Sequence, residues 1–271
     1  MKKKMLFIGM IAASLAVRSQ PELFAQVTVP AHLELAPLAQ VTVPGRPTPA
    51  PGVASGDGND IVAEMDRRMN FDECRMLIRI EDAKADGKTR VLEARVEYLR
   101  GVGTRLDFTE PARDRGKSVL MAGGSMWMSA PTVSKPVRLS GKDSFMGTSF
   151  TNDDAMNLEK SDDYEAKVVS SDADAWDLVL TARSPELPYP RIEARVGRDY
   201  LPLRMAYFTR SGRESKRVEF SAPKAFGGKL RPSAMSIVDL MKPGDRSRLL
   251  FLDIREEAVS RSRLLPSSLG K

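Results

Sequence analysis

The stretch MLIRIEDAKADGKTRVLEARVEY, residues 76–98, decides the fold of this chain. Met76, Ile78 and Ile80 alternate with Leu77 and Arg79, and apolar and polar side chains alternate along residues 92–98. Asp86-Gly87 between them is typical of a tight hairpin turn. A period of two places all apolar side chains of a strand on one face. The stretch therefore predicts two antiparallel strands with one buried face and one face in water. The apolar positions are Met76, Ile78, Ile80, Leu92, Ala94, Val96 and Tyr98.

The same pattern continues toward the C-terminus. It predicts about ten strands joined by short turns, without long helices between them. That order indicates a mainly β fold, a strongly curved antiparallel sheet or an incomplete barrel. The further strands are expected around residues 106–108, 119–121, 126–128, 176–182, 192–196, 203–208, 217–220 and 249–254.

Two helices are expected beside the strands. Ile61, Val62, Met65 and Met69 recur at helical spacing after the capping residues Asp57, Asn59 or Asp60. A second, short helix is expected through Met156 and Leu158, capped by Asn152 or Asp153. Because this helix interrupts a run of strands, we expect it to cover the concave side of the sheet.

Residues 1–25 are typical of a secretory signal peptide. A lysine-rich start precedes an apolar run of about thirteen residues that ends before Ala25, and such a run is shorter than the roughly 20 residues that span a bilayer. Cleavage after Ala25 and export to the periplasm of a bacterium with two membranes are therefore expected, with a retained anchor as the alternative.

The formal charge of +6 falls to about +3 without residues 1–25. Since the remaining charges are mixed in sign, nucleic acid is not an expected partner.

Residues 26–56 form a proline-rich linker, and the hexamer Ala-Gln-Val-Thr-Val-Pro of residues 25–30 recurs in it at residues 39–44. Proline at this density favours an extended tether, and a docking peptide is the alternative. The folded domain is expected to occupy residues 57–271.

The only histidine, His32, lies in the linker, and Cys74 is the only cysteine. This excludes a Ser-His-Asp triad, a cysteine–histidine pair, an intramolecular disulfide and a multi-histidine zinc site from the domain.

Other short motifs carry no recognisable chemistry. Gly116-Lys117-Ser118 is similar to the end of a phosphate-binding loop, but Pro111 stands where that loop needs its first glycine. The pair Asp153-Asp154 lies among capping residues, which favours a helix start over an acid–base pair. We therefore expect no catalytic residue, no metal site and no cofactor, and hence no enzymatic activity.

Three motifs between Pro111 and Asp154 carry a family resemblance. They are Arg115-Gly116-Lys117, then Ser125-Met126-Trp127-Met128 with Pro131, then Ser144-Phe145-Met146-Gly147-Thr148-Ser149-Phe150 with Asp153-Asp154. Together they resemble the LolA-like outer-membrane lipoprotein-sorting family, and the similarity extends over residues 57–271. The chain departs from the family at Leu264, where phenylalanine is usual, at Ser129, where an aromatic residue is common, and in its proline-rich linker.

The resemblance implies an incomplete antiparallel β-barrel whose opening helices cover, and a periplasmic carrier that buries acyl chains. On residue chemistry alone the methionines and aromatics in this region fit either a solid core or a pocket; the resemblance favours a cavity for acyl chains. It also places Arg105 near the position at which the classical carriers have an arginine that contacts the lid. A surface salt bridge is the alternative role for Arg105. The expected cavity residues are Met121, Met126, Trp127, Met128, Phe145, Met146, Phe150 and Met156.

Two functions remain open from the sequence. The first is a carrier that accepts a lipoprotein or lipid cargo from an inner-membrane transporter, contacts membranes transiently and delivers the cargo toward the outer membrane. The second is a non-catalytic accessory or scaffold subunit of such a transporter, with its interior filled by its own side chains. A hydrolase would need an activated nucleophile, which the sequence lacks.

Overall fold

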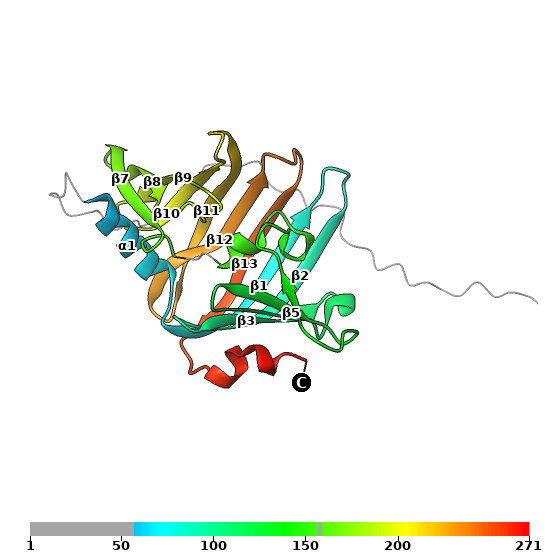
Figure 1. The fold of residues 1–271 in the computed structure, drawn as a ribbon. Coiled ribbons are helices and arrows are strands. Elements are labelled where there is room, and N and C mark those ends of the chain that lie inside the picture. Colours follow the sequence, from blue (N-terminus) through cyan, green and yellow to red (C-terminus); the bar gives the residue numbers. More distant parts are fainter. Residues whose placement is uncertain (1–56, 157–158, 271) are drawn as a thin grey trace, which may run out of the picture. The chain divides into compact units, whose positions relative to one another are not determined.

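The computed structural model describes residues 57–156 and 159–270. The expected signal peptide, the linker and His32 lie outside these residues, and so does the end of the predicted second helix. The described part contains one sheet of 13 strands, few helices, and the curved open arrangement that the sequence predicts (Figure 1). The predicted fold is confirmed.

The sheet is formed by two meanders that meet at its centre. The first contains β1 (Glu73–Ala83), β2 (Thr89–Leu99), β3 (Gly103–Glu110), β4 (Ser118–Ala122), β5 (Ser125–Ser129) and β6 (Val137–Leu139). The second contains β7 (Tyr164–Ser171), β8 (Ala175–Ala182), β9 (Arg191–Gly197), β10 (Pro202–Phe208), β11 (Glu214–Phe226), β12 (Lys229–Asp239) and β13 (Arg246–Arg255). Each strand pairs with its sequence neighbour, and β1 pairs antiparallel with β13, which leaves β6 and β7 at the two ends of the sheet.

The predicted hairpin is present with the expected register. Ile80 lies opposite Leu92, and Ile78 lies opposite Ala94. The turn contains Gly87 at a φ of +82°, a backbone conformation that favours glycine. The apolar side chains of both strands belong to one buried cluster on the concave face of the sheet.

Three strands were absent from the prediction, and each lacks the expected pattern. β6 has three residues. β7 buries only Tyr164 and Ala166, and its remaining residues are exposed. β12 contains Pro232, which lies opposite Pro223 of β11. Because proline has no N–H to donate to a neighbouring strand, its presence in a sequence argues against a paired strand.

Helix α1 (Gly58–Met69) packs along β7 and one end of β12. Asp57 caps its first turn, since its side chain accepts a 3.0 Å hydrogen bond from the backbone N–H of Asn59. The helix buries Ile61, Val62 and Met65 against β8, β9 and β10. At Gly58 the backbone approaches Ala166 so closely that a Cβ atom would lie 2.4 Å from its carbonyl oxygen, so only glycine fits there.

The short helix α2 (Asn152–Met156) follows the 3₁₀-helix η2 (Phe145–Gly147). Its predicted cap was wrong by one residue, because Thr151 forms a reciprocal pair with Asp154. The Thr151 hydroxyl accepts from the Asp154 N–H at 3.2 Å, and the Asp154 carboxylate accepts from the Thr151 N–H at 2.7 Å. Phe145 and Phe150 of this segment pack into the concave cluster, which places the segment over the concave face (Figure 1).

The opposite face carries the C-terminal segment with η3 (Arg261–Leu264) and η4 (Pro266–Ser268), beside β3 and β4. Val259, Leu264 and Leu269 pack on Leu120 in a separate cluster. This segment is drawn in red beneath β3 in Figure 1. The sheet is therefore covered on both faces, by different parts of the chain.

Candidate functional site

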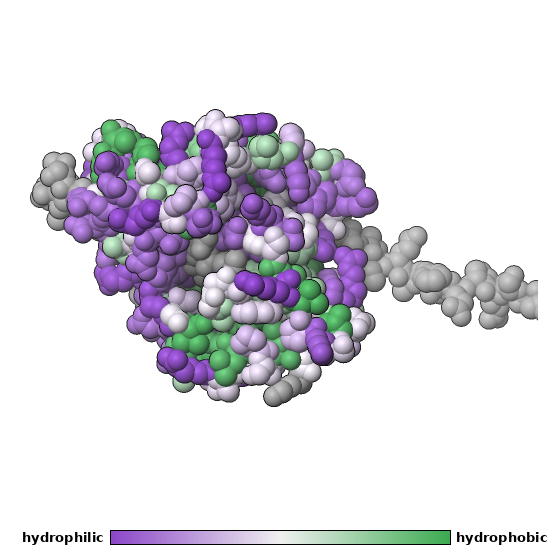
Figure 2. Space-filling view, in the orientation of Figure 1, coloured by the Kyte–Doolittle hydropathy of each residue, from purple (hydrophilic) through white to green (hydrophobic). Residues whose placement is uncertain are grey.

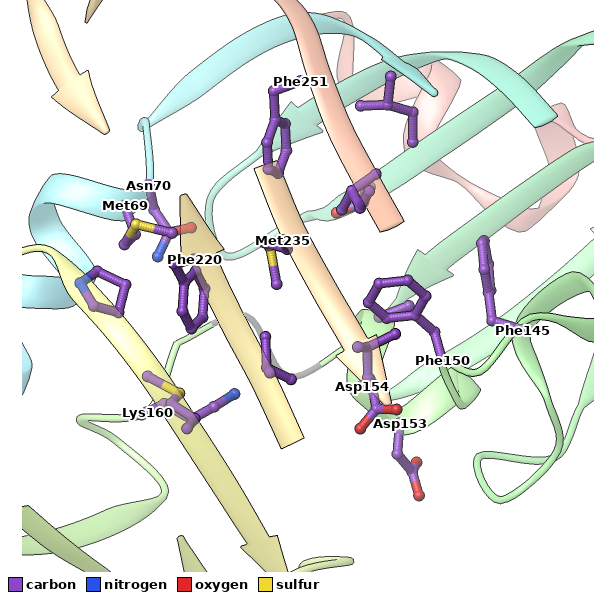
Figure 3. Close-up of a pocket in the computed structure, with 18 of the residues that line it drawn as sticks. Met69, Asn70, Phe145, Phe150, Asp153, Asp154, Lys160, Phe220, Met235 and Phe251 are labelled. Carbon is purple, nitrogen blue, oxygen red and sulfur yellow. The ribbon is translucent and has the colours of Figure 1, made fainter. Parts of the chain in front are cut away.

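A cavity of about 190 Å³ lies on the concave side of the sheet. Its walls come from α1, from the η2–α2 segment and from strands of both meanders (Figure 3). Most of the wall is apolar, and methionine and phenylalanine contribute much of it. These side chains are Met65, Met69, Met76, Met121, Met205, Met235, Phe145, Phe150, Phe220 and Phe251.

Three of the residues expected to line a cavity do so. Met121 projects from β4, and Phe145 and Phe150 come from the η2–α2 segment. Phe145 packs 6.4 Å from the ring of Phe108, measured between ring centroids. The two phenylalanines lie at one end of the cavity and Asn70 and Phe251 at the other (Figure 3).

Four of the expected residues lie elsewhere. Met126 and Met128 pack in the concave cluster, but the cavity wall does not include them. Met146 also packs on this cluster, and its carbonyl accepts a hydrogen bond from Arg90. Trp127 alternates with Met126 along β5 and so projects to the other face, against the C-terminal segment. Met156 ends α2, and its side chain lies outside the described part of the structure.

Arg105 is on the face opposite the cavity. Its guanidinium donates to Asp107 at 2.9 Å, to the Ser268 hydroxyl at 3.1 Å and to the Ser268 carbonyl at 3.3 Å. It thereby holds the C-terminal segment, not α1 or the η2–α2 segment that border the cavity. The side chain is almost fully buried, which also separates it from an exposed surface salt bridge.

A buried polar group lies at the wall near α2. Lys216 pairs with Asp154 and donates a 2.7 Å hydrogen bond to the Tyr189 hydroxyl, which itself donates to Asp154 at 3.0 Å. Burial raises the pKa of Tyr189 above its ordinary value, and the nearby Asp154 carboxylate adds to this effect. Burial likewise raises the pKa of Asp153, with a further contribution from Asp154. Because donors and acceptors match, this group closes the wall without leaving a charge unpaired.

A second polar group joins α1 to the chain that leads into β7. Asp66 is buried on α1 and accepts 2.7 Å hydrogen bonds from the backbone N–H groups of Lys160 and Ser161. Burial raises the pKa of Asp66 and lowers that of Lys160. Both side chains line the cavity.

The end of α1 rests on two cations of β12. Arg231 donates to the carbonyl of Met69, and Lys229 donates to the carbonyl of Asn70 at 2.8 Å. Arg231 lines the cavity, whereas Lys229 does not. Cationic donors at a helix C-terminus satisfy its free carbonyl groups and interact favourably with the helix dipole.

Sequence reasoning missed the contribution of α1 and of the second meander to the cavity. The signal was present as alternation, because Val218 and Phe220 of β11 and Leu249 and Phe251 of β13 each lie two residues apart. Alternation shows that such residues share a face, but it does not show which face is concave. The cavity-facing set therefore required the sheet curvature.

Among residues 57–156 and 159–270, no group of three or more His, Cys, Asp or Glu side chains is arranged to hold a metal ion. In the same part of the chain, no helix combines the length and apolar character that a membrane crossing requires. Polar side chains dominate the upper part of the face shown in Figure 2, with an apolar area over β7 and further apolar areas in the centre and at the bottom of the view. On that strand Val168 and Val169 are exposed, Val169 by 62%.

A family model, described as that of an uncharacterized protein, matches residues 102–269. No curated protein matches the chain. Among solved structures, a LolA superfamily protein from Nitrosomonas europaea is 23% identical with a TM-score of 0.70, and the match covers 79% of this chain and 100% of that one.

Two further structures are similar over comparable lengths. A DUF1329 family protein from Desulfovibrio piger is 20% identical with a TM-score of 0.72, over 78% of this chain and 97% of that one. A structure described as an outer membrane lipoprotein-sorting protein domain, from Vibrio parahaemolyticus, is 18% identical with a TM-score of 0.69, over 79% and 98%. These matches confirm the LolA-like resemblance at the level of the fold.

Proposed function

We propose that this chain, which belongs to the family of uncharacterized proteins whose model matches residues 102–269, is a periplasmic carrier. It binds the acyl chains of a lipoprotein or a related amphiphile in the concave cavity and moves this cargo toward the outer membrane. The observation that carries the proposal is the apolar cavity between the sheet, α1 and the η2–α2 segment. The LolA-like fold supports it.

The wall chemistry suits acyl chains. Each methylene that leaves water for an apolar wall contributes about 0.8 kcal/mol, so a few of them give useful affinity without a polar contact. Methionine side chains adapt to a flexible chain better than branched side chains do, and phenylalanine rings add large apolar surfaces. Met69, Met235 and Phe220 supply such surfaces where α1 meets the sheet.

The size of the cavity limits the ligand that it holds without movement of its walls. Its volume of about 190 Å³ is below the roughly 300 Å³ at which pockets for drug-sized molecules begin, and near the roughly 150 Å³ of an engineered cavity that binds benzene. A long acyl chain therefore needs α1 or the η2–α2 segment to move outward. A cover that opens and recloses also suits a carrier, which has to release its cargo.

The remaining parts of the proposal concern location and partners. The expected signal peptide would export the chain to the periplasm, an inner-membrane transporter would supply the cargo, and contact with membranes would be transient. The carrier would use no cofactor and perform no catalysis. The accessory-subunit alternative expects an interior filled by the protein's own side chains, and the cavity favours the carrier over it.

A cavity-filling variant tests the proposal. Val218→Phe places a larger side chain in the wall, and Val96→Phe does so at a second wall position. Val169→Phe makes the same chemical change on the exposed surface of β7 and is the matched control. Binding of a fluorescent acyl probe is expected for wild type and the control, and is expected to be lost in the cavity variants while circular dichroism shows them folded.

Lipid extraction of the exported wild-type protein, followed by mass spectrometry, provides the second measurement. Co-purifying acyl lipid supports the carrier. Wild-type protein that carries no lipid and binds no acyl probe would overturn the proposal and favour the accessory subunit.

A further inference from the structure

Arg231 is a buried cation in the wall of an apolar cavity. It projects from β12 with 4% of its surface exposed. Its guanidinium carbon lies 4.2 Å from the centre of the Phe251 ring, and one of its terminal nitrogens donates to the Met69 carbonyl at the end of α1. It therefore lies near the end of the cavity where Figure 3 shows Met69, Asn70 and Phe251.

The donors of this guanidinium are not all used. An arginine offers five N–H donors, and the Nε of Arg231 is buried without a hydrogen-bond partner among residues 57–156 and 159–270. In the same residues no carboxylate lies within ion-pair distance of it. A buried donor without a partner is costly, and so is a buried charge without a counter-ion.

Two other buried cations of the domain have a carboxylate partner. Arg105 pairs with Asp107, and Lys216 pairs with Asp154. Close to Arg231 the titratable neighbour is Cys74, and burial raises the pKa of this thiol to about 11, which keeps it neutral at pH 7. Burial lowers the pKa of Arg231 to about 10, so the guanidinium still carries its charge at neutral pH.

The contact of Arg231 with α1 does not account for its buried charge or for its unpartnered Nε. Lys229, two residues earlier on the same strand, also binds carbonyl groups at the end of α1, those of Asn70 at 2.8 Å and Arg67 at 3.4 Å. It does so without lining the cavity. The helix contact uses a terminal nitrogen of Arg231, and Nε remains without a hydrogen-bond partner in the described part of the chain.

We infer that Arg231 binds the anionic headgroup, a carboxylate or a phosphate, of an amphiphile whose acyl chain occupies the cavity. The inference rests on the proposed function and narrows its cargo to an anionic lipid. A guanidinium matches these groups with two parallel N–H donors, and such charge-assisted hydrogen bonds are stronger than neutral ones. The apolar surroundings strengthen the pair further, since water does not screen it.

Two ligands with the same chain and different headgroups test the inference. Dodecanoate and dodecanol are compared by displacement of a fluorescent acyl probe, at a pH well above the pKa of the carboxylic acid. Wild type is expected to bind dodecanoate at least about tenfold more tightly, which corresponds to one charge-assisted hydrogen bond. Arg231→Met is expected to lose this preference and to bind dodecanol as wild type does. Lys229→Met, the matched control, is expected to keep the preference, because it removes a neighbouring charge outside the cavity.

A measurement on wild type covers the case in which Arg231→Met does not fold. The Nε–H resonance of Arg231 in a ¹⁵N NMR spectrum is expected to shift on addition of dodecanoate and not on addition of dodecanol. Inorganic phosphate is the third ligand. If phosphate alone shifts this resonance at the same concentration, the site takes free anions and the inference of an amphiphile is wrong.

The outcomes separate the two proposals. If wild type binds both ligands equally, or if Arg231→Met keeps the preference, the inference is overturned while the acyl cavity stands. If Lys229→Met loses the preference as well, the general positive potential and not Arg231 selects the anion, which also overturns the inference. If wild type binds neither ligand, the carrier proposal and the inference fall together.

Discussion

The carboxylate of Asp66 on α1 accepts a 2.7 Å hydrogen bond from the backbone N–H of Lys160, a residue 94 positions further along the chain. The same oxygen atom accepts from the N–H of Ser161 at 2.7 Å. Both Asp66 and Lys160 line the cavity. This contact therefore ties the helix that covers the cavity to the chain segment that leads into β7.

The first prediction concerns the pH dependence of this tie. Burial raises the pKa of Asp66 above its ordinary value of 3.8, so folding favours the protonated carboxyl group. The stability that Asp66 contributes is therefore complete below pH 3.8 and is lost as the pH rises through the raised pKa. The Asp66→Asn variant serves as the reference, because its amide side chain does not ionise. The free energy of unfolding of wild type minus that of Asp66→Asn, measured by urea denaturation across this range, is expected to fall with rising pH.

Because other titrating groups are common to both proteins, their contributions cancel in this difference. A difference that stays flat, or that rises with pH, would contradict burial as the dominant effect on Asp66. Circular dichroism at each pH verifies that both proteins are folded before denaturant is added.

The second prediction concerns the buried pair of Lys216 and Asp154. Lys216→Met leaves the Asp154 carboxylate in the wall without its cation, and loss of one partner of a buried pair costs about 3–5 kcal/mol. Asp154→Asn removes the charge and keeps an oxygen that accepts from the Thr151 N–H. The double variant is expected to be more stable than the sum of the two single effects predicts, with a coupling energy of about 1–3 kcal/mol from chemical denaturation. Additive effects would show that the pair contributes no specific interaction.

The β1–β2 hairpin was predictable because its determinants are local. Alternation at Ile78 and Ile80, the turn at Gly87 and the return at Leu92 all lie within one stretch, and their pairing follows from it. Helix α1 was predictable for the same reason, since Asp57 and the spacing of Ile61 and Met65 mark its start and its buried face. Local patterns therefore predicted the curved sheet and all of its strands except β6, β7 and β12.

The cavity was less predictable, because it depends on contacts between distant segments. Met126 and Trp127 are adjacent in one motif, but the strand sends Met126 into the concave cluster and Trp127 to the opposite face. Arg231 precedes Pro232 in a strand without clear alternation, so its position in the wall follows only from the pairing of β12 with β11. The sequence identified the concave apolar segment around Phe145 and Phe150, whereas α1 and the strands of both meanders supply the rest of the wall.

The third prediction separates the role of Arg105 from the cavity. Arg105→Met removes the hydrogen bonds to Ser268, Ser118 and Asp107 and is expected to lower the free energy of unfolding by about 1–3 kcal/mol. Leu264→Ala, in the segment that Arg105 holds, is expected to cost about 2–5 kcal/mol because its side chain is fully buried. Both variants are expected to bind an acyl probe as wild type does, since they act on the opposite face.

Trp127 reports on the same segment. It packs against the C-terminal cluster, so release of this segment is expected to shift its fluorescence to longer wavelength. Loss of probe affinity in a folded Arg105→Met protein would instead show that Arg105 acts on the cavity, as a lid contact does.

The last prediction concerns how a long chain enters. While a chain fits the cavity of about 190 Å³, affinity is expected to rise by about 0.8 kcal/mol for each added methylene. Longer chains have to displace α1, so their association is expected to be slower than that of short chains in stopped-flow fluorescence. Asp66→Ala removes the tie to Lys160 and Ser161 and is expected to accelerate association of long chains while leaving short chains unchanged. Glu64→Ala, which removes ion pairs to Arg67 and Arg68 within the same helix, is the matched control and is expected to leave both rates unchanged. Equal rates for long chains in wild type and Asp66→Ala would show that α1 is not the part of the cover that opens, and would leave the η2–α2 segment as the entry.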